Sequence, residues 1–548
     1  MRNILKQTNR YLALPLLAGV MLTSCTDLEV EPTDSLLAEG FTGIETAEAA
    51  SSQVTAMYND LYGYFGTQAN LYALNEVTTD ALLVPTRGSD WGDNGIWRQL
   101  HQHSWTPEHQ YILGVWNEWN GLQLQASEVL DSRSASSTEA VGHAAFIRGL
   151  SMFIILDNFG QVPYRDTESA DPLGDPDVLT GEDAVSFILS DLDTAISNLP
   201  ASSAGDDNSR ATKAAARYLK AKVLLNRHIY NGSGTPDSAD MTEIISLVDG
   251  IEGDGYELAD NYFDIFVPGG DTETIFYVQA SAGARIFNTL HYNSTELGGG
   301  GWNGFSTLAE FYDLFEGDAN SNRGLNDGTL QDGQETRRGF VPPSGIAFDG
   351  SFGSDENGDG IVDGSNVGFG FLIGQQYGPN GAALEDRNGS PLSFTRDFFS
   401  AVDGQPSLVD NNEVTGIRVI KYNPRDGAFA NHIIFFRYSD AYLMKAEAIL
   451  RGGNDPGGQT PTTMINELRT LRGAAPLGTV TEQDLLDERA RELYTEGWRR
   501  NDLIRFGQYT KDWDFKEADA VGNPDRQLFP IPSAQLILNP NLVQNPGY

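Results

Sequence analysis

Apolar residues recur every three or four positions along much of the first half of the chain. This spacing places them on one face of a helix and is typical of helices that pack against a core. The pattern predicts helices over residues 46–65, 107–130, 138–158, 181–199 and 211–230. Successive helices of about this length favour helix–turn–helix units stacked as in tetratricopeptide arrays, although no faithful repeat motif accompanies them.

The pattern changes near residue 250. From there to residue 431 Gly, Asn and Asp are frequent, and the strand-like pieces are short, at 274–279 and 416–422. Helical spacing then returns at 438–451, 462–471 and 483–495. Because rigid frames commonly carry their binding residues on loops, the central stretch is where we look for a site.

These patterns predict a mostly α-helical fold with tetratricopeptide-like helix pairs. We expect a single domain over residues 41–548, with a helical scaffold at about 41–250 and 432–548. A loop-rich insertion containing short strands is expected at about 251–431. No long Pro/Ser/Gly linker divides the chain.

The N-terminus predicts export and lipid anchoring. Three basic residues precede an apolar run over residues 11–22, which is shorter than the roughly 20 residues that a membrane-spanning helix needs. The run ends in Leu-Thr-Ser before Cys25, the only cysteine of the chain, and this arrangement resembles a bacterial lipobox. We therefore expect a signal peptide at 1–24 and a lipidated tether at 25–40 that anchors the protein to a membrane. An ordinary secretory signal with an incidental cysteine is the alternative.

The net charge of the chain is −40, and it becomes −43 once the three basic and no acidic residues before Cys25 are removed. A charge of this size repels phosphate backbones and anionic headgroups, so nucleic acid is not an expected partner. It also favours a neutral ligand over a sulfated or uronate-rich polymer. High solubility is an equally good explanation of the same charge.

Two loop regions combine flat aromatic side chains with planar polar groups. Their candidate ligand-binding residues are Arg87, Asp90, Trp91, Asn94, Trp97, Tyr292 and Trp302. A sugar ring offers C–H groups on its face and hydroxyls on its edge, so it needs an aromatic surface beside amide, carboxylate or guanidinium groups. These residues predict a glycan-binding surface. The alternative is that the tryptophans are core residues or contact a partner protein.

A second candidate site is an acidic, Gly-rich stretch that follows the spacing of a calcium-binding loop. Its expected oxygen ligands are Asp355, Asn357, Asp359, Ile361 (through its carbonyl) and Asp363. The twelfth position is Asn366 where Glu is usual, which lowers the expected affinity for Ca2+. We expect a structural Ca2+ here, and an acidic turn without metal is the alternative.

No catalytic motif with a specific spacing is present in the sequence. His101, His103 and His109 cluster in the chain, which suits either an ordinary polar loop or a zinc or copper site. Glu488, Glu492 and Glu496 recur every four residues, and we interpret them as a charge-paired row neutralised by Arg489, Arg491 and Arg499. A glycosidase needs only two placed carboxylates, so hydrolysis stays open as an alternative function.

Several segments together resemble one known family. The most specific are FRYSDAYLMKAEA at 436–448, ERARELYTEGWRRNDLIRFG at 488–507, LFPIP at 528–532 and NPNLVQNPGY at 539–548, with FIRGL at 146–150 and FGQVPY at 159–164 upstream. They are similar to the SusD/RagB family of outer-membrane lipoproteins, and the similarity runs over nearly the whole chain. The resemblance implies a helical fold on four tetratricopeptide-like pairs, and a TonB-dependent outer-membrane barrel (SusC-like) as partner.

The residues and the resemblance together give the functional hypothesis. We expect a non-catalytic surface protein that captures a poly- or oligosaccharide, such as a neutral β-glucan, and delivers it to the transporter. Three alternatives stay open: a surface glycoside hydrolase, a binder of peptide or another nutrient for the same kind of importer, and a purely architectural lid.

Overall fold

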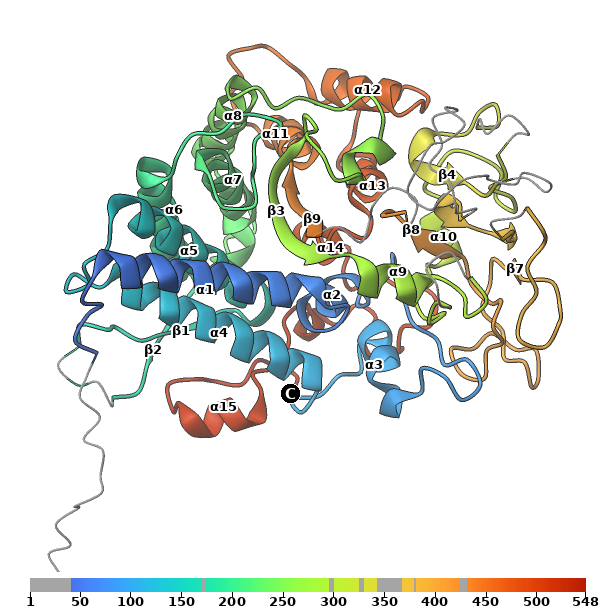
Figure 1. Ribbon diagram of the computed structural model, residues 1–548, viewed down its shortest axis with the longest axis horizontal. Coiled ribbons are helices and arrows are strands. Elements are labelled where there is room, and N and C mark those ends of the chain that lie inside the picture. The colour runs from blue at the N-terminus through green and yellow to red at the C-terminus, as the bar shows by residue number, and fades with distance from the viewer. Residues whose placement is uncertain are drawn as a thin grey trace, which may run out of the picture. The chain divides into compact units, whose positions relative to one another are not determined.

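A computed structural model describes residues 41–169, 171, 174–294, 300–324, 330–342, 367–378, 381–423 and 431–548. They all belong to the unit that runs from Gly40 to Tyr548. In Figure 1 the long helices occupy one side of this unit and most of the short strands occupy the other. The predicted mostly α-helical class with short strands is confirmed.

The longer helices are α1 (Ala47–Gly66), α4 (Gln110–Leu130), α5 (Thr138–Phe159), α6 (Gly181–Asn198), α7 (Lys213–Tyr230), α8 (Ser238–Gly253), α11 (Tyr438–Leu450), α12 (Pro461–Leu471) and α13 (Glu482–Leu493). The shorter helices are α2 (Asn70–Glu76), α3 (Ile96–Gln102), α9 (Gly283–Thr289), α10 (Ala309–Tyr312), α14 (Arg499–Arg505) and α15 (Ser533–Leu538). The predicted helices agree with the observed ones within a few residues. The sequence reading missed α8, although Met241, Ile244, Ile245 and Val248 carry helical spacing and are buried.

Helix α5 is the centre of the scaffold. Most of its residues are buried on every side, which is expected of a helix that is apolar all round. It is the one helix in the described residues that is long and apolar enough to cross a membrane, but 83% of its apolar window is buried inside the protein. Gly149 lets α6 approach, since a Cβ there would lie 3.2 Å from the Leu192 side chain.

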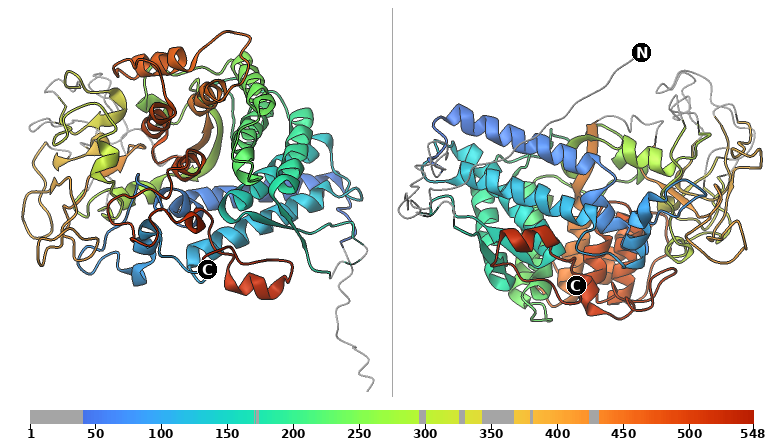
Figure 2. Two further views of the ribbon diagram at one scale, coloured as in Figure 1. Left: turned by 180° about the vertical axis from the view of Figure 1, so that it is seen from behind. Right: turned by 90° about the horizontal axis from the view of Figure 1, so that it is seen from below.

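The scaffold helices pack in chain order as stacked pairs. Helix α4 packs on α5, α5 on α6, α6 on α7, and α7 on α8, and α11 then closes against α8. Figure 2 shows the same succession from behind and from below. Side-chain caps stop the ends of several helices from fraying: Thr46, Ser137 and Thr212 each accept a hydrogen bond from the first turn that follows.

Two paired strands bracket most of the segment that was predicted to be a loop-rich insertion. Strand β3 (Thr274–Ser281) pairs antiparallel with β9 (Asn431–Arg437), so chain segments about 150 residues apart lie side by side. The remaining strands are β1 (Gln161–Tyr164), β2 (Asp177–Thr180), β4 (Gly339–Phe340), β5 (Phe369–Leu372), β6 (Gly374–Gln375), β7 (Ser393–Phe394) and β8 (Arg418–Ile420). They form the sheets β1–β2, β4–β5–β8 and β6–β7.

A buried network of ion pairs ties the insertion to the scaffold, and it corrects part of the expected charge row. Glu488 binds Arg337 of the insertion at 2.7 Å, and Glu492 binds Arg437 at 2.9 Å, with all four side chains essentially inaccessible to solvent. Glu496 lies beyond the end of α13, because that helix stops at Leu493.

The prediction of which arginines pair with the glutamate row was mostly wrong. Of the three arginines named from spacing, only Arg491 binds the row, at 2.6 Å from Glu488. Arg489 instead pairs with Asp440 and Asp502, and Arg499 pairs with Asp80. The partners come from distant segments, and neighbouring positions on one helix do not reveal them.

Candidate functional site

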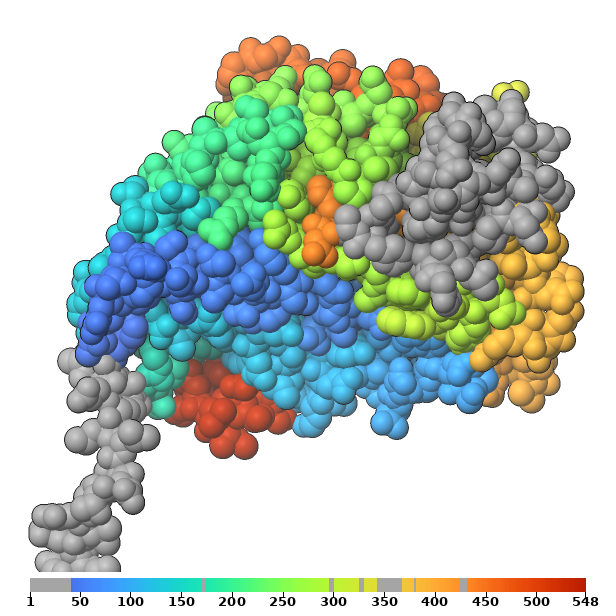
Figure 3. Space-filling view, in the orientation of Figure 1, coloured from blue at the N-terminus to red at the C-terminus, as the bar shows by residue number. Residues whose placement is uncertain are grey.

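Four loop segments that are far apart in the sequence meet on one surface. Tyr292 donates a hydrogen bond to Asp90 at 2.8 Å, and Arg387 forms an ion pair with the same carboxylate at 2.7 Å. The Asn293 side chain reaches the carbonyl of Glu385 at 2.8 Å. Figure 3 shows the segment that follows α9 next to the segment that follows β7 on one face. We call this the candidate surface, made by residues 87–95, 290–294, 300–305, 385–388 and 411–415.

Trp302 is the most exposed aromatic side chain of the candidate surface, with 42% of its area accessible. One face of its indole stacks on Phe287, with 5.4 Å between the ring centroids and 21° between the planes. Its backbone is held on both sides, since its N–H donates to the Phe287 carbonyl and its own carbonyl accepts from the Trp91 indole at 2.7 Å. The indole is therefore a fixed flat platform with one face open to solvent.

Trp91 lies half-buried beside this platform in a backbone conformation that bulky residues rarely adopt, with φ of +60°. A side chain at Gly304 would collide with it, because a Cβ there would lie 2.8 Å from the indole of Trp91. A glycine at position 304 is thus required for Trp91 to reach the Trp302 carbonyl. The structure brings these two predicted residues together.

The prediction that Trp97 contacts a ligand is wrong for this structure. Only 2% of Trp97 is accessible, and its ring packs edge-on against Trp91, Tyr111 and Phe305. Trp97 belongs to α3, where its spacing from Leu100 marks the buried face of a short amphipathic helix. Its buried ring packs against Trp91 and supports that side chain.

Arg87 is also buried, with 2% of its area accessible, so the expectation that it contacts sugar is corrected. Its guanidinium donates to the carbonyls of Asn303, Asn412 and Thr415 and to the Ser306 hydroxyl, at 2.8–2.9 Å. Burial lowers the pKa of Arg87 to about 9. Arg87 therefore clamps loop 411–415 to the segment that carries Trp302.

The polar part of the candidate surface is an ordered cluster around Arg387. This guanidinium lies 3.8 Å above the Tyr292 ring and binds both Asp90 and Glu413. Partial burial acts to raise the pKa values of both carboxyls, but their hydrogen bonds, among them those from Arg387, outweigh it and lower both pKa values below the ordinary range. His291 binds Glu413 at 3.0 Å, and burial lowers the pKa of that imidazole to about 4.

Asn94, the last predicted contact, is exposed at the edge of the surface. It follows Asp93, and both residues adopt left-handed backbone conformations with φ of +53° and +37°. Asn and Asp tolerate this region better than other residues because their short side chains bond locally. Asn94 is therefore accessible to a ligand at this edge of the candidate surface.

The sequence reading missed Phe287, Arg387 and Glu413. Residues 385–413 are roughly 300 positions away from Asp90, and loop closure over such a distance leaves no local periodic trace. The one available signal was the isolated Arg387 within a strongly acidic insertion, which would have indicated a carboxylate partner.

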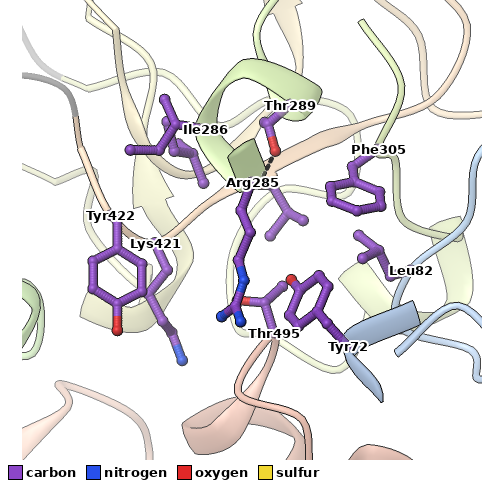
Figure 4. A pocket seen from close by; sticks show the side chains of 11 residues that line it. Tyr72, Leu82, Arg285, Ile286, Thr289, Phe305, Lys421, Tyr422 and Thr495 are labelled. Carbon is purple, nitrogen blue, oxygen red and sulfur yellow. Dashed lines mark hydrogen bonds between the residues drawn. The ribbon is translucent and has the colours of Figure 1, made fainter. Parts of the chain in front are cut away.

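A small cavity behind the candidate surface is too small to hold a sugar. It is lined by Tyr72, Arg285, Phe305 and Lys421 among others, and its volume is about 20 Å³ (Figure 4). That volume accommodates about one water molecule. The Arg285 guanidinium fills much of the space, stacked 3.9 Å above the Tyr72 ring. Ligand binding in this region is therefore confined to the outer face.

The three clustered histidines are separately buried and do not face one another as metal ligands. The ring nitrogens of His101, His103 and His109 bind the carbonyls of Asp514, Thr78 and Ile96 at 2.8–3.1 Å. Within the described ranges no group of three His, Cys, Asp or Glu residues is placed to hold a metal ion. His101 lies within α3, and His103 is the C-cap residue of that helix.

Two predicted sites fall outside the described residues. Cys25 precedes residue 41, and the proposed calcium ligands Asp355, Asn357, Asp359, Ile361 and Asp363 lie between residues 342 and 367. Both stay predictions.

Comparison with known proteins identifies the family. Residues 272–548 match the model of the SusD family, and residues 36–225 match a model described as "Starch-binding associating with outer membrane". The chain belongs to the SusD family, so the resemblance found in its motifs is confirmed.

Individual relatives agree with this membership. The starch-binding protein SusD of Bacteroides thetaiotaomicron is 26% identical over 96% of each chain. A SusD-like protein of Bacteroides fragilis has the same fold at 19% identity, with a TM-score of 0.63 over 94% of this chain and all of that one. The surface glycan-binding protein A of Bacteroides thetaiotaomicron, solved with laminarihexaose, gives 17% identity and a TM-score of 0.61 over 91% and 99% of the two chains.

Proposed function

We propose that this protein is a non-catalytic cell-surface lipoprotein that captures a poly- or oligosaccharide and delivers it to a TonB-dependent outer-membrane transporter. The observation that carries the proposal is the fixed, solvent-facing indole of Trp302 beside ordered polar groups. A sugar ring stacks its C–H face on such a platform, while Asn94, Asp90 and Arg387 meet its hydroxyls.

The electrostatics of the surface support binding without hydrolysis. A glycosidase needs a carboxylic acid that stays protonated near neutral pH, which requires a raised pKa. The hydrogen bonds that Asp90 and Glu413 receive instead lower both pKa values, so each is a charged acceptor. These two carboxylates suit the recognition of hydroxyl groups better than proton donation.

A neutral glucan, such as a β-glucan, is the ligand that we favour. The net charge of −40 disfavours polyanionic ligands. Starch and laminarihexaose, the ligands named for two similar proteins, are both uncharged glucose polymers or oligomers. Shallow binding on an open surface suits a protein that must release its cargo to a transporter.

The membrane anchor and the barrel partner complete the proposal. The lipobox-like sequence at Cys25 and the family description both favour attachment to the outer membrane. Two acyl chains or more would hold the protein firmly, because each buried methylene contributes about 0.8 kcal/mol.

A panel of polysaccharides tests the binding proposal. The chain without residues 1–25 is run in native gels that contain laminarin, starch, alginate or a sulfated polymer. We expect retardation by at least one neutral glucan, no retardation by the charged polymers, and no release of reducing ends. No retardation by any polymer of the panel, or cleavage of the glucan, would contradict the proposal.

We also infer that the acidic stretch at residues 355–363 binds Ca2+. Its oxygen-bearing side chains have the spacing of a calcium loop, and a divalent cation would offset their mutual repulsion. In calorimetry we expect one Ca2+ per chain, and we expect Asp359→Ala to abolish that heat. An unchanged titration in the variant, or no heat in the natural chain, would overturn the inference.

A further inference from the structure

A second hollow lies outside the candidate surface, between the loop after β7 and the turn at residues 513–516. Its volume is about 380 Å³, within the range of roughly 300–1,000 Å³ that is typical of small-molecule sites. Six of its lining residues bear on ligand binding: Arg396, Asp397, Phe399, Pro406, Asp514 and Phe515.

The apolar wall of this pocket is aromatic and open to solvent. Phe399 is 40% exposed, and only a few other large apolar side chains of the described residues are as exposed. Phe515 lies half-buried across from it and is supported by Phe398, whose ring it meets edge-on at 5.9 Å. Pro406 extends the apolar wall. Flat apolar groups of this kind suit the C–H face of a sugar ring.

Phe515 is held in a strained backbone conformation, with φ of +71°. Glycine or asparagine usually occupies this region, and a bulky residue there is an outlier that indicates a role for its side chain. The turn is fixed from both sides, since the Asp514 carbonyl binds His101 at 2.9 Å and the Lys516 N–H donates to the Trp513 carbonyl at 3.2 Å. The strain therefore places an aromatic ring at the pocket wall.

The rim of the pocket supplies hydrogen-bonding groups. Asp397 and Asp514 are exposed and offer carboxylate acceptors. Arg396 is positioned by an ion pair with Asp313 and by a hydrogen bond to the Ala319 carbonyl at 2.8 Å. Exposed acceptors and a fixed guanidinium beside aromatic rings are the same combination that the candidate surface shows.

The pocket and the candidate surface share two chain segments. Loop 396–415 lines the pocket at one end, and at its other end it carries Thr415 and Glu413, which bind Arg87 and Arg387. Trp302 and Leu308, one in each site, are six residues apart, so their Cα atoms lie at most about 20 Å from each other. A single extended ligand can therefore reach both.

We propose that the pocket at Phe399 and Phe515 is a second saccharide subsite, which binds a further part of the same glucan chain that Trp302 engages. This inference rests on the proposed function. Simultaneous engagement of two sites by one chain converts the second binding step into an intramolecular one, which raises the affinity for long chains only.

Titration with glucan fragments of increasing length tests the subsite. The ligands are laminaritriose, laminarihexaose and polymeric laminarin, or the matching series of whichever neutral glucan retards the protein. We expect Phe399→Ala to lower the affinity for the polymer about three- to tenfold and to leave the affinity for the trisaccharide unchanged. Trp302→Ala should weaken binding at every length.

Two further variants make the result specific. Val402→Ala truncates an even more exposed apolar side chain (81% against 40% for Phe399) in the same loop but outside the pocket, and should leave binding unchanged at every length. Phe515→Gly suits the left-handed turn and should preserve folding while it reduces binding of the polymer. The subsite is overturned if Phe399→Ala binds ligands of every length as tightly as the natural chain does, or if its affinity falls by the same factor at every length. Neither result contradicts binding at the candidate surface. If the natural chain binds no glucan, the proposed function itself fails.

Discussion

Replacement of Trp302 by alanine is expected to abolish measurable glycan binding. The indole is the one fixed aromatic platform of the candidate surface that faces solvent broadly, with Phe287 behind it. Truncation of such a central aromatic contact typically costs about 2 kcal/mol, which is about a 30-fold loss of affinity. For a ligand that is already bound weakly, that loss removes retardation in a native gel.

The folded protein should tolerate this change. Trp302 contributes its backbone, not its ring, to the bond with Trp91, so the loop keeps its main tie. Trp302→Phe keeps an aromatic face on Phe287 and should retain part of the affinity. Ile537→Ala, at a side chain that is 84% exposed on α15, is the control and should bind like the natural chain. Equal affinity of Trp302→Ala and the control would show that the glycan binds elsewhere.

The second large effect concerns stability and pH. Glu76 lies at the end of α2 with no exposed area, and Gly497 donates to one of its oxygens at 2.5 Å. Its other oxygen has no hydrogen-bond partner among the described residues. Burial raises the pKa of this carboxyl to about 8, so the folded protein holds it protonated at neutral pH.

The direction of the pH dependence follows from that raised pKa. Below pH 4.5 Glu76 is protonated in both states and has no effect on the pH dependence of folding. Between pH 4.5 and 8 the unfolded chain ionises while the folded chain does not, which lowers the free energy of unfolding by about 1.4 kcal/mol per pH unit. The loss reaches about 3 kcal/mol at pH 7.

Glu76→Gln removes this ionisation and keeps an acceptor for the Gly497 N–H. In urea unfolding at pH 5, 6, 7 and 8, the free energy of unfolding of Glu76→Gln should increase relative to that of the natural chain as the pH rises. Glu482→Gln, at an exposed position in the first turn of α13, is the control, and its free energy of unfolding should change with pH as that of the natural chain does. A difference between Glu76→Gln and the natural chain that stays constant over this range would mean that Glu76 is already ionised in the folded state.

Periodic apolar spacing accounts for how well the helices could be predicted. Helix α5 was placed within one residue because its apolar run, its Ser137 cap and its terminal Gly160 all agree. The insertion has no such period, so β3 and the three-residue β8 were recognised and the four-residue β5 was not. Helix α8 was missed because it sits where the composition begins to change, although its own spacing is regular.

Residue type proved easier to predict than residue role at the candidate surface. Trp302, Trp91, Asp90 and Tyr292 do lie together, as expected of aromatic and polar groups in loops. Trp97 has the same chemistry, but it is buried, because a seven-residue helix turns that position inward. Exposure depends on contacts between segments that are distant in the chain, and such contacts are not visible in local sequence.

The most direct test of the central claim is a crystal structure of the chain soaked with laminarihexaose or with the neutral glucan that the panel selects. We expect a glucose ring stacked on the solvent face of Trp302, with its hydroxyls bonded to Arg387, Asp90 or Asn94. A ligand bound away from Trp302, or a Trp302 face that stays bare at saturating ligand, would contradict the account.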